Sequence, residues 1–82
     1  MATNLDIRFF LLNDPMYASS ISEEITDDFG LIESGVLDSI GIFNLVAHLE
    51  KTYNISIEAS DLVESNFRSI NAITSFVKAR QK

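Results

Sequence analysis

Apolar residues recur at helical spacing in three separate stretches of this chain. In the first, residues 4–12, they form a broad face, so we expect a helix that is largely buried. Its members are Leu5, Ile7, Phe9, Phe10, Leu11 and Leu12. Asp14-Pro15 should end this helix, because the residue before a proline is disfavoured in the helical region.

The clearest helical pattern covers residues 39–53. At 100° per residue, three faces separate around this helix. The core face comprises Ile42, Leu45, Val46, Leu49 and Tyr53. The polar side comprises Gly41, Asn44, His48, Lys51 and Thr52. A third stripe, opposite the core face, comprises Ile40, Phe43 and Ala47 with Glu50 at its edge. Periodicity alone leaves two roles open for this outer stripe, an interface or packing by another helix.

Two shorter predictions cover the C-terminal third. Ser69 is a good N-cap for a last helix over residues 70–80. The apolar face of that helix comprises Ile70, Ile73, Phe76 and Val77, and its last turn is basic. Asn54 should end the central helix, an extended link should follow, and we expect a short helix over about residues 60–64.

The segment from residue 16 to residue 38 is ambiguous. Ser20 and Glu23 have the spacing of a capping box, which allows a short helical turn. Its polar content and two glycines favour a long loop instead. We expect that loop to be pinned to the core by Ile25, Phe29, Leu31 and Leu37. The resulting fold is all-α: a small four-helix bundle of three main helices and one short helix, with a long first loop.

Composition limits the classes of function. The chain has 82 residues, which suits one domain over 1–82, and no apolar run long enough to cross a membrane. No secretory signal precedes the first helix, so we expect a cytoplasmic protein without membrane insertion. Cysteine is absent, which excludes disulfides and thiolate metal sites, and we expect no metal centre.

The charge pattern bears on partners. The net charge is −6, which argues against binding nucleic acid. The segment from position 14 to position 64 contains eleven acidic residues and one basic residue, Lys51. Such a segment would attract basic protein surfaces, although a merely solvated acidic surface explains it equally well.

Candidate chemistry gathers where the central helix begins. Asp38 is a strong N-cap type, and Gly35 just upstream tolerates the backbone angles of a tight turn. Ser39 is then expected to present an exposed hydroxyl at the mouth of a helix, where the dipole and free N–H groups favour a phosphate.

The sequence offers little for catalysis. His48, the only histidine, lies nine positions after Ser39 and half a revolution away on the same helix. It cannot activate that hydroxyl in a monomer, and is most simply a solvated surface residue. Leu37 stands where a nucleophile elbow needs glycine, and no Walker-type loop or calcium loop is present. We therefore expect a protein that is not an enzyme.

The stretch Leu31-Ile-Glu-Ser-Gly-Val-Leu-Asp-Ser-Ile-Gly41 resembles the phosphopantetheine attachment segment of acyl carrier and peptidyl carrier proteins. The residues of this segment are most similar to those of stand-alone carriers such as the D-alanyl carrier proteins. The resemblance implies that a phosphopantetheinyl transferase uses coenzyme A and magnesium to place 4′-phosphopantetheine on Ser39, with Asp38 assisting. The thiol of the arm would carry an acyl or aminoacyl group as a thioester between enzymes. Carriers of this kind also have a long first loop.

The resemblance also points to partners. Because the central helix is the main recognition element of carriers, it favours the interface role for Ile40, Phe43 and Ala47, with Glu50 beside them. It adds three secondary contact candidates for which core and capping roles are equally open, namely Ile57, Asp61 and Leu62. Expected partners are the transferase, a loading ligase for acyl or aminoacyl groups and downstream transferases, acting on a monomer.

Two questions stay open. Gly41 and Asn44 replace the acidic residues frequent in acyl carriers, and Lys51 interrupts the usual acidic end, which favours a dedicated pathway, but the cargo cannot be identified. The alternative function is a small acidic helical interaction module without a prosthetic group, which would bind a partner helix through the same outer stripe.

Overall fold

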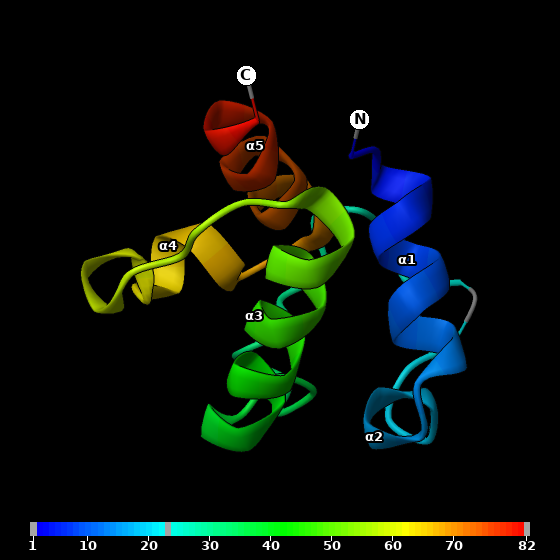
Figure 1. Cartoon of the computed structure of the whole chain (residues 1–82). Helices are drawn as coiled ribbons and strands as arrows, with labels where there is room; N and C mark the ends of the chain where they lie inside the picture. The colour runs from blue at the N-terminus through cyan, green and yellow to red at the C-terminus, as the bar shows by residue number, and fades with distance from the viewer. Residues whose placement is uncertain (1, 23, 82) are drawn as a thin grey trace.

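The protein is described by a computed structural model that covers residues 2–22 and 24–81. Within these residues the elements are all helical: α1 (Asn4–Asn13), α2 (Pro15–Ala18), α3 (Ser39–Tyr53), a 3₁₀ turn (Ala59–Asp61), α4 (Glu64–Phe67) and α5 (Ile70–Arg80). Figure 1 shows α3 through the middle of the molecule, with α1 on one side and α4 on the other. The all-α prediction is confirmed, with α1, α3 and α5 as the three main helices. None of the helices in this part of the chain is long and apolar enough to span a bilayer.

Helix α1 is formed as predicted, but one of its two apolar sides is exposed to solvent. A capping box starts it, in which Thr3 and Asp6 exchange side-chain to backbone hydrogen bonds of 3.2 Å. Ile7 and Leu11 are buried, whereas Leu5 and Phe9 remain 74% and 69% exposed. The prediction of a largely buried helix is therefore wrong. Apolar residues occupy two sides of α1 roughly half a turn apart, and the rest of the molecule covers only one of them.

Helix α2 was not predicted. Asp14 ends α1 in an extended conformation and caps the next helix, because its carboxylate accepts a hydrogen bond from the backbone N–H of Met16 at 2.9 Å. Pro15 then occupies the first helical position, where its missing N–H is not needed. An Asp-Pro pair can thus start a helix as well as stop one. The new helix buries Tyr17 completely.

The long first loop is confirmed, and most of its anchors are where they were expected. Leu31 and Leu37 are buried, and Ile25 and Phe29 are partly buried against the same core. The described residues between α2 and α3 contain turns but no helix. The capping-box hypothesis for a helical turn here depends on Glu23, which lies outside the described residues.

One residue, Asp27, ties this loop to both ends of the chain. Asp27 accepts hydrogen bonds from the Arg8 guanidinium at 2.6 Å and the Asn4 amide at 3.0 Å, both on α1. Its backbone carbonyl accepts a hydrogen bond from the N–H of Asn71 on α5 at 3.0 Å. The Arg8 hydrogen bond, aided by Asn4, lowers the pKa of the Asp27 carboxyl. The middle of the loop is therefore fixed to α1 and α5.

The connection after α3 agrees with prediction at its start and differs further on. Asn54 ends α3 in the left-handed conformation, with φ 54°. The short helix expected over 60–64 is wrong: a 3₁₀ turn comes earlier and α4 begins at Glu64. The Asp61 carboxylate accepts a hydrogen bond from the Glu58 N–H at 2.9 Å, which closes the 3₁₀ turn, and Leu62 then leaves helical geometry.

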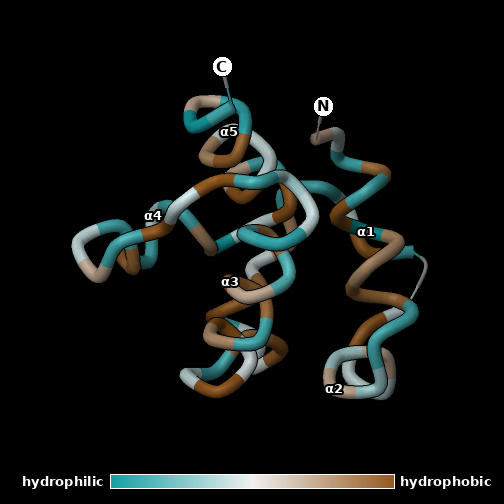
Figure 2. Tube along the Cα trace, in the orientation of Figure 1, coloured by the Kyte–Doolittle hydropathy of each residue, from teal (hydrophilic) through white to brown (hydrophobic). Residues whose placement is uncertain are grey.

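Helix α5 matches its prediction at both ends. The Ser69 hydroxyl accepts a hydrogen bond from the N–H of Ala72 at 3.0 Å. All four residues of its predicted apolar face are buried. Figure 2 shows hydrophobic segments recurring along α1, α3 and α5. The buried cluster joins these helices to α2, α4 and the long loop.

Candidate functional site

The Asp38-Ser39 pair stands at the start of α3 with the predicted geometry. Asp38 is extended, and its carboxylate accepts a hydrogen bond from the N–H of Gly41 at 2.7 Å. Ser39 is the first residue of the helix and is exposed, as are Asp38 and Ile40 on either side. The side chain of Ser39 therefore lies at the positive end of the helix dipole and open to solvent.

The backbone just before this pair is held firmly. Gly35 turns the chain with φ +87°, a conformation that favours glycine. Val36 and Leu37 follow and are buried, and the N–H of Leu37 donates a hydrogen bond to the carbonyl of Leu31 at 2.9 Å. Two buried side chains thus fix the position from which Asp38 and Ser39 emerge.

The polar side of α3 is covered along part of its length: Gly41, Asn44 and His48 are at least partly buried, whereas Lys51 and Thr52 are exposed. Gly41 is buried because the Tyr17 ring packs against it, and the Tyr17 hydroxyl donates a hydrogen bond to the Gly41 carbonyl. The Asn44 amide donates hydrogen bonds of 3.2 Å to both the Tyr17 hydroxyl and the Asp14 carboxylate. Burial raises the pKa of the Tyr17 phenol. Helix α2 therefore supports the first turns of α3 directly.

His48 belongs to the same covered side. Its ring stacks on that of Phe10 from α1, with 3.8 Å between centroids and an angle of 12° between planes. Its Nδ1 and the Thr52 hydroxyl share a hydrogen bond of 3.3 Å. Partial burial lowers the pKa of the His48 imidazole. The interpretation of His48 as a solvated residue is wrong, but it still points away from Ser39.

The outer stripe is exposed as predicted. Ile40 is 70% exposed and Phe43 is 65% exposed, and Ala47 is also open to solvent. No helix of the described chain covers this side of α3, so the packing alternative is not what the structure shows. The role of these three residues in binding partners stays a prediction.

The other four candidate contact residues have structural roles. Glu50 accepts a hydrogen bond from the N–H of Ile57 at 2.8 Å, which ties the link after α3 back onto that helix. Leu62 is partly buried against the core. Asp61 forms an ion pair with Arg80 from α5. Their contacts with partners remain predictions as well.

Arg80 organises this region in a way the sequence analysis missed. Besides pairing with Asp61, its guanidinium donates a hydrogen bond to the carbonyl of Ser56 at 3.2 Å and lies 5.1 Å from the centre of the Phe76 ring. Hydrogen bonds from the Glu58 backbone and then from Arg80 lower the pKa of the Asp61 carboxyl. The final turn of α5 thus holds the segment between α3 and α4.

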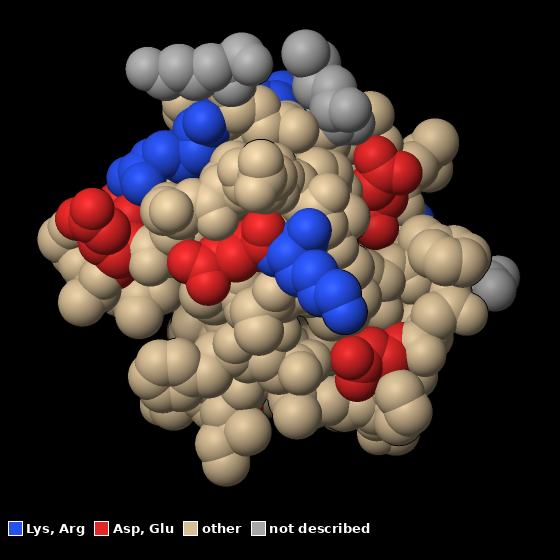
Figure 3. Space-filling model, in the orientation of Figure 1, with Lys and Arg blue, Asp and Glu red and all other residues tan. Residues whose placement is uncertain are grey.

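Charge is dispersed over the face seen in Figure 3, where acidic and basic side chains form small separate groups on a largely uncharged surface. Within residues 2–22 and 24–81, no group of three or more His, Cys, Asp or Glu side chains is arranged to hold a metal ion.

These features define a class of protein. A helical bundle that exposes an Asp-Ser pair at the start of its central helix suits a carrier whose serine is modified. Residues 20–77 match the family described as "Phosphopantetheine attachment site". The chain therefore belongs to the family of phosphopantetheine carrier proteins, and its cofactor is covalently attached 4′-phosphopantetheine. The interaction module without a prosthetic group is not favoured.

Particular relatives sharpen this assignment. The chain is 31% identical over 70 residues to the D-alanyl carrier protein of Streptococcus pyogenes serotype M5 (strain Manfredo), which covers 85% of this chain and 86% of that protein. It is also 31% identical over 75 residues to the D-alanyl carrier protein of Streptococcus suis (strain 05ZYH33), covering 89% of this chain and 92% of that protein. The similarity thus extends over most of each chain.

Proposed function

We propose that Ser39 is the residue that bears the phosphopantetheine arm. The observation that carries this proposal is its exposure at the first position of α3, directly after the Asp38 cap. The N–H groups of a helix start can accommodate the phosphodiester that attachment creates, so the residues present fit the group.

In the attachment step, the chain is a substrate. The Ser39 hydroxyl oxygen bonds to the phosphorus that carries the pantetheine of coenzyme A, its proton is released, and the nucleotide part of coenzyme A leaves. A separate transferase with magnesium would catalyse this exchange. Asp38 holds the helix start in place, and His48, the only histidine, lies on the opposite side of α3, where it cannot accept the proton of Ser39.

The arm would then carry an acyl or aminoacyl group as a thioester. The names of the relatives support an aminoacyl cargo, with D-alanine as the first to test. A loading ligase and a downstream transferase would each dock on the exposed stripe of Ile40, Phe43 and Ala47. The protein contributes presentation, and the chemistry is performed by these partners in the cytoplasm.

Mass spectrometry tests the attachment residue. The apo protein is incubated with a promiscuous phosphopantetheinyl transferase, magnesium and coenzyme A, and we expect the mass of one phosphopantetheine to be added. Ser39→Ala should remove the addition completely. Ser34→Ala, which alters another exposed serine five residues upstream, is the matched control and should be modified normally. Modification of a folded Ser39→Ala protein would place the arm elsewhere.

A further inference from the structure

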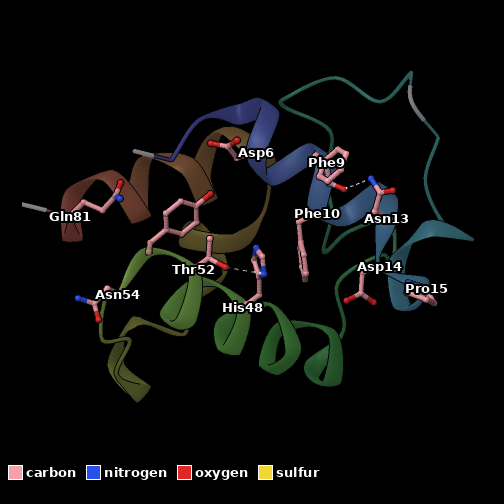
Figure 4. A pocket seen from close by; sticks show the side chains of 11 residues that line it. Asp6, Phe9, Phe10, Asn13, Asp14, Pro15, His48, Thr52, Asn54 and Gln81 are labelled. Carbon is pink, nitrogen blue, oxygen red and sulfur yellow. Dashed lines mark hydrogen bonds between the residues drawn. The ribbon is translucent and has the colours of Figure 1, made fainter.

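A groove of about 760 Å³ lies between α1 and the C-terminal part of α3, on the side of α3 away from Ser39. Figure 4 shows Phe10 and His48 next to each other in the middle of its lining, with Asp14 and Pro15 towards one end and Asn54 and Gln81 towards the other. We call it the rear groove. Nine positions separate Ser39 from His48, which is half a revolution, so an occupant of the groove would leave the arm free.

The groove is lined and bordered by apolar and aromatic surface. The stacked rings of Phe10 and His48 form one wall. Phe9, which also lines the groove, is 69% exposed, and Leu5, one helical turn before it, is 74% exposed. Two large apolar side chains on neighbouring turns, left open beside a concave surface, are typical of a site that another molecule covers.

The charge of the groove is of one sign. Among the residues that the structure describes, its lining includes the carboxylates of Asp6 and Asp14 and no lysine or arginine. Asp6 and Asp14 accept hydrogen bonds from backbone N–H groups, and Asp14 also from Asn44. The two ion pairs seen among the described residues involve other carboxylates, those of Asp27 and Asp61. The groove therefore complements a cationic group.

We propose that the rear groove binds a basic amphipathic segment of a protein partner. An apolar side chain of that segment would cover Phe9 and Leu5, and a lysine or arginine would approach the carboxylates of Asp6 and Asp14. Such a partner would bind the carrier on the side of α3 away from Ser39 while enzymes act on the arm. This surface is separate from the outer stripe of α3, so the proposal does not depend on which enzymes load the arm.

Nuclear magnetic resonance tests the proposal on the ¹⁵N-labelled holo protein. The probe is a short helical peptide with two leucines four positions apart and lysines on either side. Its matched control has every lysine replaced by glutamate. We expect the lysine peptide to shift the amide signals of Phe10, His48 and Thr52 saturably, the glutamate peptide to leave them unchanged, and about 0.5 M salt to weaken the binding.

Two variants locate the binding surface. Phe9→Ser should weaken binding of the lysine peptide by about tenfold or more, because a central aromatic contact is removed. Phe43→Ser changes an equally exposed phenylalanine on the outer stripe and should leave peptide binding unchanged. Since both side chains are solvent-exposed, both variants should keep the helical circular dichroism of the parent.

Four results would overturn the proposal. They are shifts that do not saturate at millimolar peptide, equal binding of the two peptides, shifts centred on the outer stripe, and loss of binding in Phe43→Ser rather than Phe9→Ser. Sedimentation showing a dimer that Phe9→Ser dissociates would assign the groove to a second copy. Flotation with anionic vesicles that Phe9→Ser abolishes would assign it to a membrane. Either finding would also overturn the proposal that the groove binds a basic segment of a protein partner.

Discussion

The two long sides of α3 that lie outside its apolar core face contrast with each other. One carries Gly41, Asn44 and His48, a polar set, and it is covered by α1 and α2. The other carries Ile40, Phe43 and Ala47, an apolar set, and it faces solvent. A helix stabilised only by burial of apolar surface would show the opposite arrangement.

The contrast indicates that the two sides of α3 have different roles. Gly41 and Asn44 on the covered side have specific partners, including the Tyr17 hydroxyl for both, so covering them costs less than burying unpaired polar atoms. The apolar side gains nothing from solvent, and we propose that it is exposed because it contacts other proteins. Stability should therefore be sensitive to substitutions on the first side, and function to substitutions on the second.

The largest effect is expected at Tyr17. Replacing this fully buried ring with alanine, Tyr17→Ala, removes its packing on Gly41 and the hydrogen bond to the Gly41 carbonyl. The free energy of unfolding should fall by about 3–5 kcal/mol, in a domain of this length that has roughly 4–12 kcal/mol in total. Urea unfolding followed by circular dichroism measures the change. A loss below about 1 kcal/mol would mean that α2 does not support α3.

A smaller loss is expected from Gly41→Ala. Alanine normally stabilises a helix by about 1 kcal/mol relative to glycine. Here the added methyl carbon would lie 3.2 Å from the Tyr17 ring, which is buried and cannot easily move. We expect a net destabilisation of about 1–2 kcal/mol in the same urea measurement. A stabilised Gly41→Ala protein would show that the contact between α2 and α3 is loose.

A pH dependence of stability should come from His48. Burial lowers the pKa of its imidazole in the folded state, so protonation favours the unfolded chain. The stabilisation is present above the unfolded pKa, near 6.5, and is lost as the pH falls from about 7.5 to about 5.5. Urea midpoints across this range should decline for the parent protein and stay flatter for His48→Gln.

The window for His48 is separate from that of the carboxylates. Asp27 and Asp61 have lowered pKa values, so their contribution is present above about pH 4 and is lost only below it. The carboxylate of Asp14 opposes the effect of burial on His48. If the parent and His48→Gln show the same slope between pH 5.5 and 7.5, the stack on Phe10 does not bury the imidazole as described.

The smallest effect on stability is expected at Phe43. Because its side chain is 65% exposed, Phe43→Asp should change the free energy of unfolding by no more than about 0.5 kcal/mol. It should nevertheless slow modification by the transferase or processing by a loading ligase. Initial rates beside circular dichroism spectra measure both quantities. Loss of the helical spectrum would instead show that Phe43 belongs to the core.

Much of the fold could be predicted because its signals are local. Asp38, Asn54 and Ser69 define the ends of α3 and the start of α5 by hydrogen bonds or backbone angles that each residue type favours on its own. The Asp-Ser pair at the start of α3 followed from the same kind of local signal, whereas the role of the outer stripe was left open by periodicity and was decided by the resemblance to carriers. The helix ends and the Asp-Ser pair need no knowledge of distant contacts.

The remainder depended on distant contacts. Both sides of α1 are apolar, and the choice of the buried side is made by α2, α3 and α5, which periodicity within α1 cannot reveal. The partial burial of His48 could not be predicted for the same reason, since Phe10, which stacks on its ring, is far away in the sequence. For α2, a local signal was present: proline directly after an aspartate cap also marks a first helical position.

Asp27 links three parts of the chain that are far apart in the sequence: the first helix, the long loop and the start of the last helix. If the loop detaches, α1 loses the ion pair between Arg8 and Asp27, and α5 loses a hydrogen bond to a loop carbonyl at its first turn. Opening in this region should therefore be cooperative, and amide protons of the loop and of both terminal helices should exchange with solvent at a common rate. The part of the fold that positions the arm would then unfold as one cooperative unit, and not residue by residue.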